Sequence, residues 1–312
     1  MTTLELAADE TLHVLVPSRR LAEAVEELSP RVRARSWKPE DELPHGEAAQ
    51  AQVWVPSTRT APEGLLEALP RLRLVQLTSA GAEGFAGRMP EGVVLCNARG
   101  AHTPATAEWV MAATLAAQRG LPFFVREHEA RRWSFTTHRS LVGARVLVIG
   151  AGDIATTVGR MLAGFDVRLT YVARRPREGV RTMSELPQLL PEADVVVLLV
   201  PLTPETTGMV DARFLTALPD GALLVNAARG PVVDTGALLA ELTSGRLRAA
   251  VDVTDPEPLP EGHPLWCAPN LLLTPHIGGE VPETWERATA AVTEQIGRIL
   301  AGQPLANVVG DY

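Results

Sequence analysis

The chain has few cysteines and no long apolar run, and each shortage excludes a class of protein. Cys96 and Cys267 are the only two cysteines in 312 residues, too few for a disulfide scaffold, and they lack the spacing of metal ligands. We expect both to be buried thiols in a reducing compartment. No apolar run approaches the roughly 20 residues that span a membrane, and residues 1–10 have no signal-peptide core. The sequence therefore predicts a soluble, cytoplasmic protein without a metal site or a membrane partner.

Basic residues never form a block, and the formal net charge is −8, so we expect no nucleic-acid partner. Aromatic residues are sparse, at 4%, whereas the 25 glycines and 25 prolines indicate many short loops. An apolar share of 46% is ordinary for a globular protein, and 312 residues suffice for two domains with buried cores.

Short apolar runs alternate with amphipathic segments along the chain, which indicates parallel sheets with helical crossovers. In the first part, we expect strands at 12–16, 32–37, 51–55, 72–77 and 93–96, and helices at 20–28 and 63–69. From an Ala-rich helix at 103–119 onward, we expect strands at 146–150, 167–173, 195–200, 222–226, 248–253 and 271–274, and a helix at 283–300. Residues 195–200 are apolar at every position, as in a central parallel strand. The predicted fold class is α/β, with two doubly wound parallel-sheet domains of Rossmann-like or flavodoxin-like type.

The segment 123–139 departs from this alternation because it is charged and has no clear period. We expect an irregular surface arm or dimer contact there, with Trp133 and Phe135 as its anchors.

A glycine-rich turn follows the apolar run at 145–149 and precedes a helix expected at 156–164. Strand, turn and helix form the context that a dinucleotide-binding G-x-G-x-x-G/A fingerprint requires. Gly150 permits the tight turn, Gly152 lets a pyrophosphate approach the backbone, and Ala155 lets helix and strand pack closely. The amide groups at the helix start would bind the phosphates. A plain strand-to-helix connection is the alternative, but the context favours a dinucleotide.

Three polar residues come just after late strands of the second predicted sheet, and therefore at the same edge as the glycine turn. They are Arg229, Glu257 and His276. A guanidinium can hold a substrate carboxylate by two hydrogen bonds, and an imidazole can move a hydroxyl proton. Taken singly, Arg229 could be a surface arginine, Glu257 a solvated acid and His276 a loop cap. Together with the glycine turn, they indicate hydride transfer at a carbon that bears oxygen.

Four motifs resemble those of the D-isomer-specific 2-hydroxyacid dehydrogenases, in order and spacing, over nearly the whole chain. They read GAGDIA at 150–155, NAARGPVVD at 226–234, DVTDPEPL at 252–259 and TPHIGG at 274–279. The resemblance implies that Arg229 binds substrate, that Glu257 tunes the histidine and that His276 is the general acid/base.

The resemblance also implies the remaining contacts. Asp252 would hold the nicotinamide carboxamide, and the backbone amides of Ala80 and Gly81 would take the substrate carboxylate. His102, where many relatives have asparagine, would touch substrate or nicotinamide, or only cap the following helix. Besides Gly150, Gly152 and Asp252, the expected cofactor-binding residues are Asp153, Ile154, Pro201, Thr207, Ala227 and the two arginines discussed next.

The end of the predicted strand 167–173 indicates which dinucleotide binds. An NAD site would show an acid about 20 residues after the glycines, to bond the ribose 2′-hydroxyl. Here the sequence has Arg174, Arg175 and Arg177 and no acid at this place. We therefore expect NADP(H) to be preferred, with NAD(H) as the alternative cofactor. A solvated basic turn is the other interpretation of these arginines.

The family pattern implies a substrate domain of residues 1–100 with 283–312, a dinucleotide-binding domain of residues 101–282, and a cleft between them. It also implies a homodimer built through the dinucleotide-binding domain. The expected activity is a D-isomer-specific reduction of a small 2-oxo acid, or the reverse oxidation. The alternative function is a cofactor-sensing, corepressor-like binding protein without turnover. A formate enzyme would be expected to have glutamine in place of Glu257.

Overall fold

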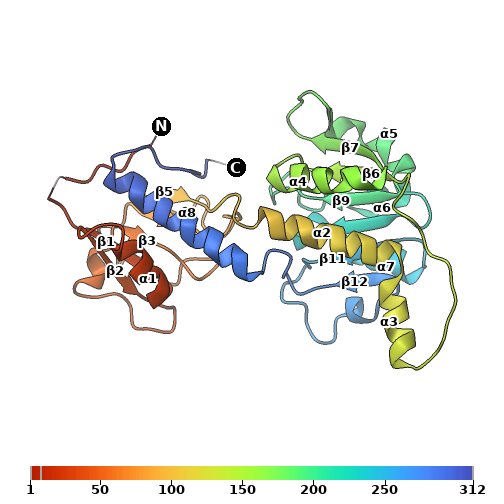
Figure 1. The fold of residues 1–312 in the computed structure, drawn as a ribbon, viewed down its shortest axis with the longest axis horizontal. Coiled ribbons are helices and arrows are strands. Elements are labelled where there is room, and N and C mark those ends of the chain that lie inside the picture. Colours follow the sequence, from red (N-terminus) through yellow and green to blue (C-terminus); the bar gives the residue numbers. More distant parts are fainter. Residues whose placement is uncertain (1, 8, 311–312) are drawn as a thin grey trace. The chain divides into compact units, whose positions relative to one another are not determined.

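The computed structural model describes residues 2–7 and 9–310, which form two compact units (Figure 1). Unit 1 contains the described residues up to His102 and those from Val281 onward, and unit 2 spans Thr103–Glu280. Each unit is built around one parallel sheet, with five strands in unit 1 and seven in unit 2. The predicted α/β class with two parallel-sheet domains is thus confirmed.

The sheet of unit 1 has the strand order β2-β1-β3-β4-β5, and every neighbouring pair is parallel. Its strands are β1 (Leu12–Val16), β2 (Val32–Ser36), β3 (Val53–Trp54), β4 (Leu74–Gln76) and β5 (Val94–Cys96). Val14 and Val16 belong to a core that α1 (Arg19–Glu26) and α8 (Pro282–Leu300) complete. Leu15, between them, belongs to a second core with Trp54. This alternation follows from the two-residue period of a strand and covers both sheet faces.

One predicted helix of unit 1 is wrong. Residues 63–69 form a succession of turns, with bonds such as that from the Ala68 amide to the Gly64 carbonyl at 3.1 Å. Gly64 has a φ of +75°, in the left-handed region, and therefore interrupts a right-handed helix. The apolar spacing reflects burial of Leu65 and Leu69 in the core rather than a helix.

The sheet of unit 2 has the strand order β12-β11-β10-β9-β6-β7-β8, again parallel throughout. Its strands are β6 (Arg145–Ile149), β7 (Arg168–Ala173), β8 (Val180–Thr182), β9 (Val195–Leu198), β10 (Leu223–Asn226), β11 (Arg248–Val251) and β12 (Leu271–Leu273). β9 lies fourth of seven and is buried at every position, as predicted for a central strand.

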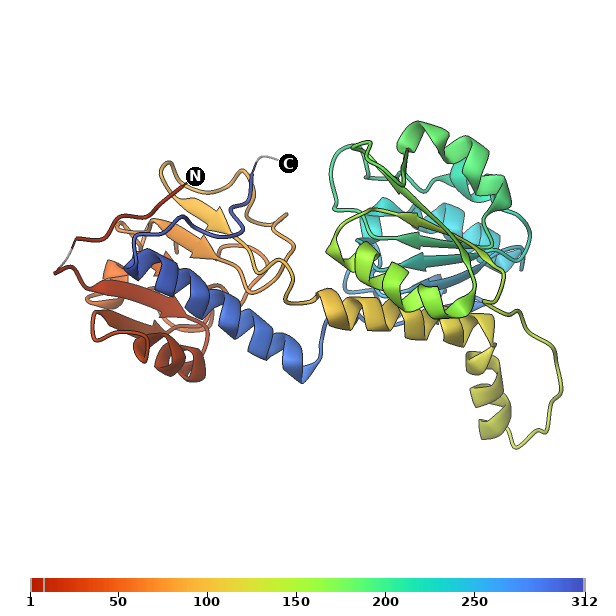
Figure 2. The same cartoon turned by 45° about the horizontal axis from the view of Figure 1, so that its top comes forward.

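Helices cover both faces of this sheet (Figure 2). One face packs on α2 (Thr103–Gln118) and α4 (Asp153–Leu162) in a shared core with Val146 and Val148. The other face packs on the shorter α5 (Leu186–Leu189), α6 (Ala212–Ala217) and α7 (Thr235–Thr243), in a core with Leu147 and Ile149. The first core lies beneath the glycine turn, because it contains Ala155 of α4.

Two local predictions in unit 2 are corrected. α4 begins at Asp153 rather than Thr156, because Gly152 takes an extended conformation and acts as its N-cap. The first part of the segment 123–139 is not irregular but belongs to α3 (Leu121–Glu129), which has proline in its first turn, where proline is tolerated. Trp133 and Phe135 do not anchor the segment within the chain, since they are 100% and 92% exposed.

The two cysteines differ from each other. Cys96 is buried at the end of β5, and burial raises the pKa of its thiol to about 12. Cys267, predicted to be buried, is exposed instead, because it ends a short 3-10 turn (Pro264–Cys267) that inserts Leu265 rather than Cys267 into the core. Within the described residues, no helix is long and apolar enough to cross a membrane.

Candidate active site

The three predicted catalytic residues follow three adjacent strands. Arg229 comes after β10, Glu257 after β11 and His276 after β12, and these strands are parallel neighbours. Their carboxyl ends share one edge of the sheet with the end of β6, where the glycine turn begins. Ligands of doubly wound sheets bind at this edge.

The imidazole of His276 is paired with the carboxylate of Glu257. His276 Nδ1 lies 2.7 Å from Glu257 Oε1, and the two side chains are 27% and 28% exposed. A carboxylate only accepts hydrogen bonds, so Nδ1 is assigned as the donor of this pair. This contact fixes the ring orientation and leaves Nε2 as the atom through which a proton would be exchanged.

The backbone of His276 is left-handed, with a φ of +56°. Its amide donates to the carbonyl of Asp252 at 2.7 Å. The carboxylate of Asp252 accepts from the Thr274 hydroxyl at 2.6 Å and from the amides of Ile277 and Gly278 at 2.9 and 2.7 Å. Asp252 is only 4% exposed, so a buried carboxylate organises the loop that carries the histidine. The sequence interpretation assigned Asp252 only to the cofactor and missed these contacts.

The loop that carries Arg229 is fixed by hydrogen bonds to the side chain of a buried asparagine. Asn226, 1% exposed, accepts from the Ala228 amide at 3.0 Å and donates to the Arg229 carbonyl at 3.2 Å. The next residue, Gly230, approaches the facing loop so closely that an added Cβ would lie 1.9 Å from the Thr254 carbonyl oxygen. Arg229 therefore starts from a fixed backbone, beside the loop that leads to Glu257.

The glycine turn has the geometry that its sequence predicts. Gly150 has a φ of +115°, and a Cβ there would lie 2.4 Å from the Leu199 carbonyl oxygen, so the turn requires glycine. At Gly152 an added Cβ would meet no atom within 4 Å, which leaves open space beside the backbone. Asp153 and Ile154 form the first turn of α4, and Ala155 is buried beneath it. These residues fit the pyrophosphate of a dinucleotide at a helix N-terminus.

The remaining predicted cofactor residues lie on loops beside this turn. Arg174 and Arg175 are exposed directly after β7, and Arg177 donates a hydrogen bond from Nη2 to the Ala151 carbonyl. On the other side, the loop after β9 holds Pro201 and Thr207. The Pro201 carbonyl accepts from Thr206 at 2.7 Å, and the Thr207 hydroxyl donates to the Thr203 carbonyl at 2.8 Å. Ala227 follows β10, and its amide donates to the Leu198 carbonyl at 3.4 Å.

The predicted substrate residues Ala80, Gly81 and His102 belong to unit 1. The Ala80 carbonyl accepts from Asn97 Nδ2 at 2.8 Å, and the Gly81 carbonyl accepts from the Ser79 hydroxyl at 2.9 Å. These two bonds shape the loop after β4. His102 is the residue directly before α2.

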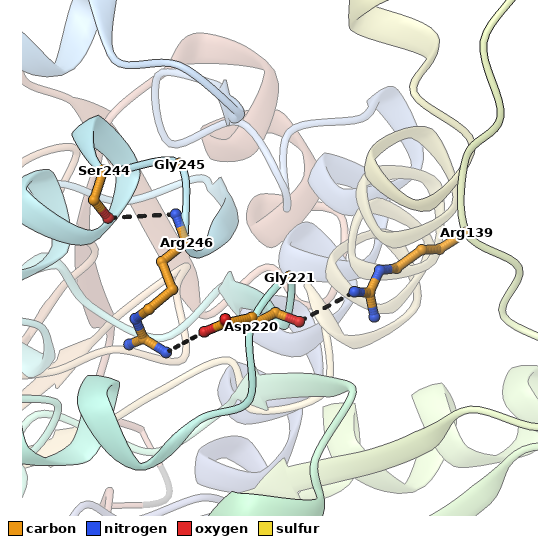
Figure 3. Close-up of a pocket in the computed structure, with 6 residues that line it drawn as sticks. All are labelled: Arg139, Asp220, Gly221, Ser244, Gly245 and Arg246. Atoms are coloured by element: carbon orange, nitrogen blue, oxygen red, sulfur yellow. Dashed lines mark hydrogen bonds and ion pairs between the residues drawn. The ribbon is translucent and has the colours of Figure 1, made fainter.

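A hollow of about 500 Å³ lies at the opposite edge of the unit 2 sheet, near the starts of β10 and β11 (Figure 3). Arg139 donates to the Asp220 carbonyl at 3.1 Å, and Arg246 lies 3.6 Å from the Asp220 carboxylate. Both arginines therefore contact Asp220, and none of the predicted site residues lines the hollow. Among the described residues, no group of three or more His, Cys, Asp or Glu side chains could hold a metal ion.

Comparisons with known proteins show which family the chain is similar to. The family described as D-isomer specific 2-hydroxyacid dehydrogenase, NAD binding domain, matches residues 111–278. D-3-phosphoglycerate dehydrogenase of Mycobacterium bovis is 34% identical over 267 residues, which are 82% of this chain and 50% of that protein. The chain thus spans about half the length of this relative.

Glyoxylate/hydroxypyruvate reductase B of Citrobacter koseri is 32% identical over 287 residues, covering 87% of this chain and 89% of the relative. A crystal structure of a D-isomer specific 2-hydroxyacid dehydrogenase from Xanthobacter autotrophicus Py2, in complex with NADPH and MES, is 31% identical. It superposes with a TM-score of 0.83 and covers 96% of this chain and 98% of the other. The chain belongs to the D-isomer-specific 2-hydroxyacid dehydrogenases, a family of nicotinamide-dependent oxidoreductases.

Proposed function

We propose that the protein is an NADP(H)-dependent oxidoreductase that interconverts a small 2-oxo acid and the D-isomer of its 2-hydroxy acid. The observation that carries this proposal is the 2.7 Å pair of His276 and Glu257 at the same sheet edge as the glycine turn. Family membership supports it, as do relatives named as reductases of glyoxylate and hydroxypyruvate.

Each residue of the group has a separate task in this proposal. His276 gives a proton from Nε2 to the substrate oxygen during reduction and takes it back during oxidation. Glu257 orients the ring through Nδ1 and stabilises the imidazolium. Arg229 binds the substrate carboxylate or carbonyl, and in unit 1 the Ala80 and Gly81 amides and His102 complete the substrate contacts. The nicotinamide, when bound, supplies or accepts the hydride.

The glycine turn and the arginines beside it support NADP(H) as the preferred cofactor. Gly150, Gly152 and the start of α4 would hold the pyrophosphate. Arg174 and Arg175 would bind the ribose 2′-phosphate, since no acid stands at the end of β7. The Xanthobacter relative was crystallised with NADPH. NAD(H) is the weaker alternative in this proposal.

The two domain roles belong to the proposal as well. Residues 1–100 with 283–312 would form the substrate domain, and residues 101–282 the dinucleotide-binding domain. The proposed assembly is a homodimer through the second of these, and the proposed location is the cytoplasm.

Steady-state kinetics test the proposal directly. Initial rates would be measured with NADPH and with NADH on glyoxylate, hydroxypyruvate, pyruvate and phenylpyruvate. We expect turnover of at least one acid, a higher kcat/KM with NADPH, and a loss of about 10²–10⁴-fold in kcat for His276→Gln. Because the imidazole acts on substrate, the variant should bind NADPH as the wild type does.

Three results would contradict parts of the proposal. Near-native activity of His276→Gln would remove its assigned role, and higher kcat/KM with NADH would reverse the cofactor preference. NADPH binding without turnover of any acid would instead favour the corepressor-like, cofactor-sensing function.

A further inference from the structure

The left-handed backbone of His276 needs an explanation. Such a conformation is unfavourable for an L-residue, because Cβ approaches the following carbonyl oxygen. A catalytic side chain that stands on such a backbone is placed correctly only while the surrounding structure holds the backbone. The bonds that do so lie on both sides of the histidine, at Thr274, Ile277 and Gly278.

All of these bonds end on one residue, Asp252. A carboxylate has about four acceptor positions on its two oxygens. Oδ1 takes the Thr274 hydroxyl and the Ile277 amide, and Oδ2 takes the Gly278 amide. Three of these positions are therefore used inside the loop. Because Asp252 is 4% exposed, its charge depends on these donors for compensation.

Asn226, which bonds the loop of Arg229, also bonds Asp252. Its amide donates to the Asn226 carbonyl at 3.0 Å, between β10 and β11. The side chain of the same Asn226 bonds the Ala228 amide and the Arg229 carbonyl. A short chain of buried polar contacts thus joins the loop of the arginine to the loop of the histidine.

Gly278 gives an independent sign that the carboxylate position is tightly set. A Cβ at this position would lie 2.8 Å from Asp252 Oδ2 and 3.3 Å from the ring of Trp109. Any larger residue would therefore push the carboxylate, the indole or the loop out of place.

We propose that Asp252 is a positioning residue, whose carboxylate fixes the left-handed backbone of His276 and thereby the approach of its imidazole to Glu257. The proposal that Asp252 fixes the loop of His276 is argued from the geometry alone. The proposal that this affects the reaction rests on the proposed function. Asp252 acts through the histidine loop, in addition to the cofactor contact assigned to it from the sequence.

Thr274 offers a test that leaves the predicted ligand contacts intact. Thr274→Val removes the 2.6 Å bond to Asp252, and Thr274→Ser restores a hydroxyl. Amide hydrogen exchange of Ile277 and Gly278 would be followed by NMR in the cofactor-free protein. We expect exchange about 10-fold or more faster in Thr274→Val, because a hydrogen bond to a charged group is lost. Thr274→Ser should stay close to the wild type, and Gly278→Ala should accelerate exchange at Ile277.

Thr114→Val is the matched control, since Thr114 is a buried threonine of α2 whose hydroxyl bonds the Val110 carbonyl at 2.6 Å. It should leave exchange at Ile277 and Gly278 unchanged. Unchanged exchange in Thr274→Val, or equal acceleration in Thr114→Val, would overturn the positioning role. These outcomes do not depend on whether the protein turns over any acid.

Kinetics then link the loop to the reaction. Thr274→Val should lower kcat about 10-fold or more, since small displacements of a catalytic group are costly, while the Kd of NADPH stays within about twofold. In a His276→Gln background, the same substitution should cost nothing further, because it acts through the histidine. An equal loss in both backgrounds would contradict the proposal. An inactive wild type with the expected exchange pattern would overturn the proposed function alone.

Discussion

At the scale of single residues, we expect Arg174 and Arg175 to set the preference between NADPH and NADH. Both are exposed at the end of β7, beside the glycine turn. A ribose 2′-phosphate carries the negative charge that a guanidinium binds through paired hydrogen bonds, whereas a ribose hydroxyl gains little from it. The two arginines should therefore affect NADPH and NADH very differently.

We predict that Arg174→Ala combined with Arg175→Ala weakens NADPH binding about 10- to 100-fold, and that NADH binding changes less than threefold. Fluorescence titration of each cofactor measures this. Arg168→Ala is the control, because Arg168 is an exposed arginine at the start of the same strand. Equal weakening of both cofactors would show that the arginines contribute only a general positive potential.

At the scale of elements, the sequence predicts the buried strands well, because burial gives them a recognisable pattern of apolar residues. The strands that follow continuous apolar runs, such as β6 and β9, were placed within two residues. The helices and strands that were not predicted are α3, α5, α6, α7 and β8, whose sequences carry no clear period. The edge that carries Arg229, Glu257 and His276 could be predicted because parallel strands share their carboxyl ends. The role of Asp252 could not, since it depends on hydrogen bonds to residues 22 to 26 positions away.

We define the arm as α3 and the following segment 130–140. One carboxylate joins these two parts by hydrogen bonds. Glu127 in α3 accepts from Arg132 and from the Ser134 hydroxyl in the extended segment. The hydrogen bond from Arg132 contributes most to lowering the pKa of this carboxyl to about 2, and Ser134 adds to it. The folded state therefore favours the ionised form, and this stabilisation is complete above the ordinary pKa of 4.5.

We predict that Glu127→Gln lowers the melting temperature at pH 6 and that the difference from the wild type shrinks as the pH falls from 4.5 towards 2. The stabilisation declines over this range because the carboxyl of the unfolded chain is protonated below pH 4.5, whereas that of the folded protein stays ionised until the pH nears 2. Thermal unfolding of both proteins across this range measures the difference. Glu129→Gln is the control, since Glu129 lies in the same helix and is exposed. A difference that persists at pH 2 would contradict this explanation.

At the scale of the whole molecule, the arm is a surface with large exposed apolar side chains that a partner would cover. Both views show α3 and its extended continuation projecting beyond the sheet of unit 2 (Figures 1 and 2). Trp133 and Phe135 are almost fully exposed on it, and Leu121 and Val125 of α3 are also exposed. The arm carries four arginines and two glutamates, within a chain whose net charge is −8. A second copy of this acidic chain would cover the apolar side chains and attract the positive charge.

We predict that the protein is a homodimer and that replacing both Trp133 and Phe135 with alanine weakens it at least about 30-fold, since large aromatic side chains dominate interface energies. Sedimentation velocity over a range of micromolar concentrations measures the dissociation constant. Trp285→Ala is the matched control, because Trp285 is a tryptophan of α8 in unit 1 that is 60% exposed. Higher salt should weaken the wild-type dimer, because the arm and the rest of the chain carry opposite charge. The prediction would be contradicted if the wild type stayed monomeric at these concentrations. It would also be contradicted if the control dissociated as readily as the double variant, because the arm would then not form the dimer interface.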